Sequence, residues 1–158
     1  MFNYFYPAIY RFARSRINDK EAAQDIAQTV FLKVARTIKS FDITKGNFST
    51  WIWQIARNTL TDHFRSTARN MADPETATNT LIDETASVEE ADHLIKDDAG
   101  QILDIVKDFS AEDQELFRLK YIAEVSYEEI AEITGRSENA LRVALHRIRE
   151  KIRNEYDG

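Results

Sequence analysis

The stretch SYEEIAEITGRSENALRVALHRIREKIR, residues 126–153, has the sequence signals of two short helices joined by a tight turn. Ser126, followed three residues later by Glu129, forms a capping box that begins a helix. Gly135 can adopt the left-handed conformation that ends a helix, and Ser137 can cap the next one. The stretch therefore predicts a helix, a turn and a second helix.

The second of these helices has one apolar face and one basic face. The face predicted to be buried holds Leu141, Leu145, Ile148 and Ile152. The opposite face holds Asn139, Arg142, Val143, His146, Arg147 and Arg153. Because arginine and asparagine can reach DNA phosphates and base edges, we predict a DNA-binding helix-turn-helix. The alternative is an amphipathic helical hairpin whose basic face is only solvated, but the spacing of Ala131, Gly135 and Leu141 favours the helix-turn-helix.

The distribution of charge supports DNA binding although the total charge does not. The 158 residues carry a formal net charge of -6. Residues 1–70 hold 11 basic and 5 acidic side chains, whereas residues 71–98 hold one basic and nine acidic side chains. The segment from Arg136 to Arg153 holds six basic and two acidic side chains. The acidic residues are therefore concentrated away from the predicted DNA helix.

Several classes of function find no support in the sequence. The chain has no cysteine, so disulfides, thiol nucleophiles and cysteine zinc sites are excluded. His63, His93 and His146 show no metal-binding spacing, and no nucleophile motif occurs. We expect no catalytic residues, no cofactor, no metal and no small-molecule substrate. No apolar run approaches the roughly 18 residues of a membrane span, so we expect a cytoplasmic protein without membrane insertion.

The periodicity of the chain predicts an all-α protein. Only four glycines and two prolines occur, and the long segments show helical rather than alternating periodicity. Residues 71–92 contain Pro74, several Thr and Asn, and many acids with few large apolar residues, which is the composition of a flexible linker. We therefore predict two small helical domains, residues 1–70 and 93–158, joined by a flexible acidic linker at 71–92.

In the first domain, Asn18 and Asp19 separate one helix from a second helix that runs from about Lys20 to Lys39. The predicted core face of this second helix holds Ala23, Ile26, Ala27, Val30, Phe31, Val34 and Ile38. The opposite face holds Asp25, Gln28, Thr29, Leu32 and Arg36. Taken alone, a leucine among these polar residues is more often a stray surface leucine, and the alternative is a docking surface.

The segment from Phe41 to Thr50 is predicted to be a loop, and Ser49 or Thr50 is predicted to cap a helix that begins at Trp51. The inward face of that helix holds Ile52, Ile55, Ala56 and Thr59. The outward face holds Gln54, Arg57, Asn58, Thr61 and Arg65. Arginines beside aromatic rings suit single-stranded nucleic acid, since unstacked bases gain roughly 1 to 3 kcal/mol each on an aromatic face. Trp51, Trp53 and Phe64 could equally be core residues.

Three stretches together resemble the extracytoplasmic-function group of bacterial RNA polymerase sigma factors. EAAQDIAQTVFLKV, residues 21–34, is similar to the helix of that family that binds core polymerase. FSTWIWQIARNTLTDHFR, residues 48–65, is similar to the helix that reads the minus-ten promoter element. Residues 126–153 resemble the module that reads the minus-thirty-five element. The resemblance implies a transcription initiation factor that directs core polymerase to specific promoters and opens the minus-ten element.

The resemblance also implies roles for individual residues. Asp25, Gln28 and Leu32 would contact the clamp helices of the largest polymerase subunit. Asn47, Phe48, Ser49 and Thr50 would capture a flipped base of the minus-ten element, and Arg57, Asn58 and Arg65 would hold the non-template strand. Arg136, Ser137, Asn139, Arg142, His146 and Arg147 would lie in the major groove of the minus-thirty-five element. The polymerase flap, promoter DNA and an anti-sigma factor are the implied partners.

One departure from the family pattern leaves other functions open. Ala144 stands where the family pattern leads us to expect an arginine, which would cost a phosphate contact. Two alternatives therefore remain. One is a sigma mimic that sequesters an anti-sigma factor, and the other is an ordinary helix-turn-helix regulator. The second alternative leaves Asp25, Gln28 and residues 48–65 without a role.

Overall fold

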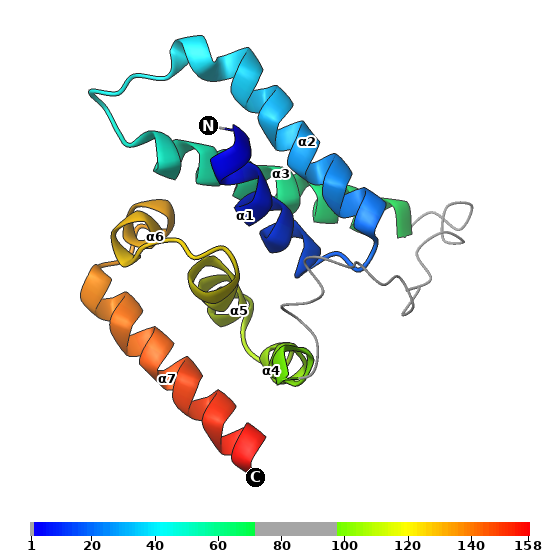
Figure 1. Cartoon of the computed structure of the whole chain (residues 1–158), viewed down its shortest axis with the longest axis vertical. Helices are drawn as coiled ribbons and strands as arrows, with labels where there is room; N and C mark the ends of the chain where they lie inside the picture. The colour runs from blue at the N-terminus through cyan, green and yellow to red at the C-terminus, as the bar shows by residue number, and fades with distance from the viewer. Residues whose placement is uncertain (1, 72–97) are drawn as a thin grey trace. The chain divides into compact units, whose positions relative to one another are not determined.

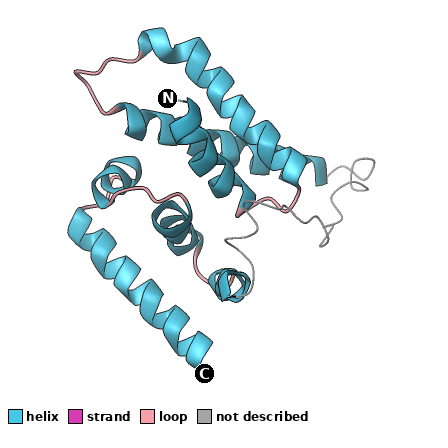
Figure 2. Ribbon diagram, viewed as in Figure 1, coloured by secondary structure: helices cyan, strands magenta, loops and turns pink. Residues whose placement is uncertain are grey.

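The computed structural model describes residues 2–71 and 98–158, which belong to two separate compact units. All regular secondary structure in these two ranges is helical, so the predicted all-α class is confirmed (Figures 1 and 2). The predicted linker, residues 71–92, lies outside the described residues except for Met71, where α3 ends.

The N-terminal unit consists of α1 (Phe2–Arg14), α2 (Lys20–Thr37), the short 3₁₀ helix η1 (Ile38–Ser40) and α3 (Phe48–Met71). Helix α2 packs against both α1 and α3. Its start is set by Asp19, whose Oδ1 accepts from the Glu21 N–H at 2.9 Å. The buried core holds Phe5, Ile9, Phe12, Ala23, Ala27, Val30, Val34, Ile52, Trp53, Ala56 and Leu60.

Two local predictions for this unit are wrong, and both concern helix ends. Helix α2 ends at Thr37, so Ile38 leaves the core face and is 41% exposed. Helix α3 begins at Phe48 rather than Trp51, because Asn47 is its cap: the Asn47 Oδ1 accepts from the Ser49 N–H at 2.8 Å. Thr50 consequently lies inside the first turn of α3 rather than at its cap.

The C-terminal unit consists of α4 (Asp98–Val106), α5 (Ala111–Phe117), the π-helical turn η3 (Arg118–Ile122), α6 (Tyr127–Thr134) and α7 (Glu138–Asp157). Helix α7 packs against α4, α5 and α6, so it is the central element of the unit. The buried core is almost entirely aliphatic and holds Val106, Leu116, Leu119, Ile130, Ile133, Leu141, Leu145 and Ile148.

The predicted helix-turn-helix is confirmed in its details. The Ser126 hydroxyl accepts from the Glu129 N–H at 3.2 Å and begins α6. Gly135 ends α6 in the left-handed conformation, at φ 72°. The Ser137 hydroxyl accepts from the Ala140 N–H at 3.1 Å and begins α7. Local capping chemistry therefore accounts for both ends of the turn.

The interpretation of Ala144 as a lost phosphate contact is wrong. Ala144 is only 2% exposed and lies on the buried side of α7, next to Leu141 and Leu145. An arginine at this position would have to leave the core of the unit, since burying an unpaired guanidinium is costly. The small side chain is therefore explained by packing.

Candidate nucleic-acid and polymerase interfaces

The outward face of α2 brings together the three residues predicted to contact polymerase. Asp25, Gln28 and Leu32 are all exposed, and Leu32 is 56% exposed. Their spacing of three and four residues places them on one side of the helix. This face therefore presents a carboxylate, an amide and an apolar side chain to a partner.

Two side chains, Asp42 and Asn47, accept hydrogen bonds that hold the loop leading into α3. The Asp42 Oδ1 accepts from the Thr44 hydroxyl at 2.6 Å and from the Thr44 N–H at 2.9 Å. These hydrogen bonds lower the pKa of Asp42 below its ordinary value. At the other end of the loop, Asn47 caps α3. Both ends of the loop are thus tied to defined side-chain contacts.

An aromatic cluster lies beneath this loop. The ring centroid of Phe41 lies 5.5 Å from that of Phe48 and 5.0 Å from that of Trp51, and the Phe48 and Trp51 centroids are 5.5 Å apart. Phe48 also contacts Phe5 of α1, at 5.8 Å between ring centroids. Aromatic pairs at such separations attract each other. Because Phe48 is only half-buried, part of its ring is accessible next to the exposed Asn47.

The four loop residues predicted to capture a base differ in accessibility. Asn47 is exposed, and Phe48 and Ser49 are half-buried. Thr50 is only 8% exposed, because α3 starts earlier than predicted and places this residue within its first turn. The side chain of Thr50 is therefore part of the interior of the unit, and Asn47, Phe48 and Ser49 form the accessible set.

The outward face of α3 carries the residues predicted to hold a DNA strand. Asn58 and Arg65 are exposed, and Arg57 is half-buried. Trp53 is 2% exposed and its ring packs on Phe12 at 5.5 Å, so Trp53 is a core residue and not a stacking platform. The face is therefore polar and basic.

A cation-π contact lies in the second half of α3, between Phe64 and Arg16. The guanidinium of Arg16 lies 4.3 Å from the ring centroid of Phe64, which is half-buried. This contact joins the segment after α1 to the second half of α3. Phe64 is thereby covered on one side by a positive charge.

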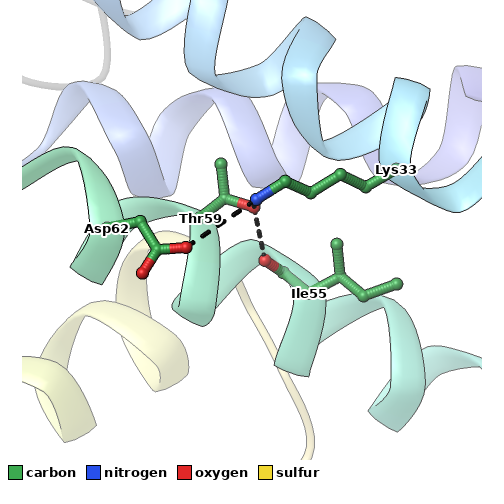
Figure 3. Close-up of polar contacts among 4 residues, drawn as sticks. All are labelled: Lys33, Ile55, Thr59 and Asp62. Atoms are coloured by element: carbon green, nitrogen blue, oxygen red, sulfur yellow. Dashed lines mark hydrogen bonds and ion pairs between the residues drawn. The ribbon is translucent and has the colours of Figure 1, made fainter.

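Lys33, which the sequence interpretation did not assign, reaches from α2 to the side of α3 (Figure 3). Its Nζ donates to the Thr59 hydroxyl at 3.1 Å and lies 3.9 Å from the Asp62 carboxylate. A lysine in the sequence of one helix gives no signal of which neighbouring helix it will reach. The contact depends on how α2 and α3 pack.

The predicted recognition residues of the C-terminal unit lie along one side of α7 and in the turn before it. Asn139, Arg142, His146 and Arg147 are exposed, and Arg136 is half-buried. Ser137 is exposed, but its hydroxyl already caps α7. The structure therefore brings the predicted set together on one surface, with Ser137 acting in the helix start.

Arg142 is held by two neighbours. Its Nη2 lies 3.6 Å from a Glu138 carboxylate oxygen, one helical turn earlier. Its guanidinium also lies 4.3 Å from the ring centroid of Tyr127 on α6, and the Lys120 ammonium lies 4.1 Å from the same ring. The aromatic ring therefore orders two cations at the surface of the helix-turn-helix.

Two further arginines of α7 contact other elements of the unit. The Arg147 Nη2 lies 3.7 Å from the carboxylate of Asp113, which is itself buried on α5. Arg149 donates to the Tyr121 hydroxyl at 2.7 Å, and hydrogen bonding to Tyr121 and Tyr127 raises the pKa of its guanidinium. The basic side of α7 is therefore supported from outside the helix-turn-helix as well.

Within residues 2–71 and 98–158, no group of three or more His, Asp or Glu side chains is placed to hold a metal ion. Over the same ranges no helix has both the length and the apolar character needed to cross a bilayer.

Two family models match this chain. The model described as Sigma-70 region 2 matches residues 1–70, and the model described as Sigma-70, region 4 matches residues 100–152. Among curated proteins, the ECF RNA polymerase sigma factor SigW of Bacillus subtilis is 30% identical over 155 residues, covering 93% of this chain and 82% of SigW. The ECF sigma factor BldN of Streptomyces coelicolor is 25% identical over 149 residues, but the chain spans only 55% of the length of BldN.

Two solved structures are similar over nearly the whole chain. The sigma factor RpoE from Bartonella quintana, in complex with the anti-sigma factor NepR, has a TM-score of 0.68 at 21% identity and covers 97% of this chain and 92% of that one. CnrH in complex with the cytosolic domain of CnrY has a TM-score of 0.65 at 20% identity, covering 95% of this chain and 80% of that one. At these identities the likeness concerns the fold.

Proposed function

This chain belongs to the extracytoplasmic-function sigma factors, which are transcription initiation factors, and we propose that it binds core RNA polymerase and directs it to specific promoters. The observation that carries the proposal is the presence of two helices, α3 and α7, with polar and basic outward faces in two separate units of one chain. Each unit alone would bind weakly. Joined in one chain and held on polymerase, the two together gain specificity through effective concentration.

In this proposal residues 1–70 bind polymerase through α2. Asp25 and Gln28 contact the clamp helices of the largest subunit, and Leu32 contributes apolar area between them. The exposure of all three on one face of α2 supports this role. Leu32, at 56% exposure, offers apolar area on this face that a partner could cover.

The same unit reads and melts the minus-ten element. The accessible part of Phe48, with Asn47 and Ser49 beside it, receives a base that has left the duplex, since an aromatic face offers stacking energy to any unstacked base. Arg57, Asn58 and Arg65 hold the non-template strand along the outward face of α3. Opening is favoured because the single strand, once released, gains contacts that the duplex cannot make.

Residues 93–158 dock on the minus-thirty-five element. In the proposed complex the side of α7 that carries Arg142, His146 and Arg147 faces the major groove, with Asn139 and Arg136 near the start of the helix. Base edges in that groove present distinct donor and acceptor patterns that arginine and asparagine can read. Residues 71–92 tether the two units. Residues 93–158 also contact the polymerase flap.

An anti-sigma factor is a further proposed partner, supported by the similar fold of the sigma factor RpoE, whose structure was solved in complex with an anti-sigma factor. The sigma-mimic alternative had the missing arginine at position 144 as its support. Because Ala144 lies in the core, that reason no longer applies. We therefore retain the initiation function as the conclusion.

The test is run-off transcription from a genomic promoter library with core polymerase, with and without this protein. Initiation should depend on the protein and fall sharply in both Asp25→Ala and Arg57→Ala, because the first weakens polymerase binding and the second weakens strand binding. Glu155→Ala and Lys20→Ala remove exposed charges elsewhere and serve as matched controls. Absence of initiation, together with tight binding to an anti-sigma factor, would establish the mimic instead.

A further inference from the structure

Among residues 2–71 and 98–158, the Lys33 ammonium has one hydrogen bond, to Thr59 of α3, which leaves most of its hydrogen-bonding capacity unused there (Figure 3). An ammonium group has three N–H donors. One of them reaches the Thr59 hydroxyl at 3.1 Å, whereas the Asp62 carboxylate, at 3.9 Å, is too far for a hydrogen bond. The Lys33 side chain is 41% exposed, so the remaining donors are accessible to a ligand.

Thr59 fixes the place of this ammonium. Its hydroxyl donates to the Ile55 carbonyl at 2.7 Å, so its lone pairs are directed to accept from Lys33. Thr59 is only 4% exposed, which means that the ammonium is anchored at the edge of a buried acceptor and not at the end of a free side chain. A charged group anchored in this way loses less conformational entropy when it binds a ligand.

The Asp62 carboxylate places a negative charge at this edge of α3. Its carboxylate is 66% exposed and lies one turn after Asn58 and three residues before Arg65, within the proposed path of the DNA strand. A carboxylate there repels a phosphate, and the Lys33 ammonium, 3.9 Å away, compensates for its charge. An exposed ion pair of this kind adds little stability by itself. Stabilisation of the fold therefore gives little reason for Lys33 to lie beside Asp62.

We propose that Lys33 is a further phosphate contact for the non-template strand, and that Thr59 is the positioning residue that holds its ammonium beside the outward face of α3. This inference rests on the proposed function of α3 as the strand-binding helix. The ligand class is a single-stranded nucleic-acid backbone, because Asn58 and Arg65 on the same edge offer further donors to it.

The experiment measures binding of a fluorescent oligonucleotide to holoenzyme assembled from the full chain and core polymerase. The oligonucleotide carries the non-template minus-ten sequence of a promoter found in the run-off experiment. Affinity is measured across a salt series, because each phosphate contact on a single strand contributes about 0.7 to the slope of log affinity against log salt. Lys33→Met should weaken binding several-fold and lower that slope by about 0.7.

Matched variants separate a phosphate contact from a brace. Lys33→Arg should keep the slope, and Lys20→Met, which removes an exposed lysine from the same helix, should leave both affinity and slope unchanged. Asp62→Asn should bind at least as tightly as the unmodified protein, because it removes a repelling charge. Thr59→Val, which removes the acceptor, should weaken binding less than Lys33→Met does.

Several results would overturn the proposal. One is a lower melting temperature in Lys33→Met with an unchanged salt slope, since that is the behaviour of a brace. Another is a loss of binding in Asp62→Asn as large as that in Lys33→Met. If Arg65→Ala lowers the slope while Lys33→Met does not, the inference fails and the proposed function of α3 stands. If neither variant lowers it, both fail.

Discussion

The outward faces of α3 and α7 differ in how their polar side chains are held. On α7, Arg142, Arg147 and Arg149 each contact a side chain of another element of their unit. On α3, the side chains of Asn58 and Arg65 have no hydrogen bond, ion pair or ring contact within the part of the chain that the structure describes, although Arg57 on the same face does have a contact. The arginines of α7 are therefore held by neighbours before DNA arrives, whereas Asn58 and Arg65 of α3 are not.

The difference matches the two kinds of DNA that these faces are proposed to bind. A duplex presents its groove in a nearly constant shape, so side chains that are already ordered lose less entropy on binding. A single strand takes many shapes, and side chains that are not committed to neighbours can follow it. Lys33, which reaches the side of α3 from α2, is held by the Thr59 hydroxyl.

The largest expected effect tests whether the DNA-binding face of α7 is supported by the buried core of its unit. Leu141→Ala removes a side chain that is fully buried under α7 and should destabilise the C-terminal unit by about 2 to 5 kcal/mol. Leu32→Ala, the same change at an exposed position, should alter stability by less than about 0.5 kcal/mol. Thermal unfolding followed by circular dichroism measures both. Equal effects would mean that α7 is not supported as described.

The next prediction concerns the ordered face itself. Arg142→Ala should weaken binding of holoenzyme to a duplex with the minus-thirty-five element by about 1 to 3 kcal/mol. Val143→Ala changes the adjacent exposed residue, at 68% exposure, and should have little effect. Fluorescence anisotropy on duplexes with and without the element gives both numbers. A similar loss on both duplexes would show that Arg142 contacts only phosphate.

Stability of the turn that precedes α6 gives a third prediction. Glu124 has φ 58°, the left-handed region that side chains other than glycine adopt at a cost. Glu124→Gly should therefore stabilise the C-terminal unit by about 0.5 to 1 kcal/mol. Glu128→Gly, within α6, should instead destabilise it by up to about 1 kcal/mol. Urea unfolding would contradict the argument if both changes had the same sign.

A smaller effect sharpens the role of Tyr127 in ordering Arg142. Tyr127→Leu removes the ring and should cost about 0.5 to 1 kcal/mol of affinity for the minus-thirty-five duplex, whereas Tyr127→Phe keeps the ring and should not. The loss should vanish in an Arg142→Ala background, because the ring acts through that arginine. Additive losses would assign Tyr127 a contact of its own.

The smallest effect lies in the loop before α3. Because hydrogen bonds from Thr44 lower the pKa of Asp42 in the folded protein, their stabilisation is fully present above pH about 3.8 and is lost as the pH falls through the lowered value. The Thr44 amide resonance should therefore titrate with a midpoint below 3.8. Asp42→Asn should abolish that titration. A midpoint at or above 3.8 would mean that the loop does not hold Asp42.

The helix-turn-helix was fully predictable from the sequence because its signals are local. Ser126, Gly135 and Ser137 act on backbone groups within four residues of themselves, so their effect does not depend on the rest of the fold. The exposed faces of α2 and α3 were likewise predictable from helical periodicity. Two errors lay at helix ends: Asn47, and not Ser49 or Thr50, caps α3, since several neighbouring side chains could each have done so, and α2 ends at Thr37.

By itself, then, the sequence determined the all-α class, the helix-turn-helix and the residues that face outward, because capping and periodicity act over a few residues. Only the tertiary structure decided which side chains meet across elements: Lys33 with Thr59, Arg142 with Tyr127, and Arg147 with Asp113. It also decided that Ala144 belongs to the core. These contacts depend on the angle and separation at which helices pack, which is set by the sum of many buried contacts and not by any short stretch of sequence.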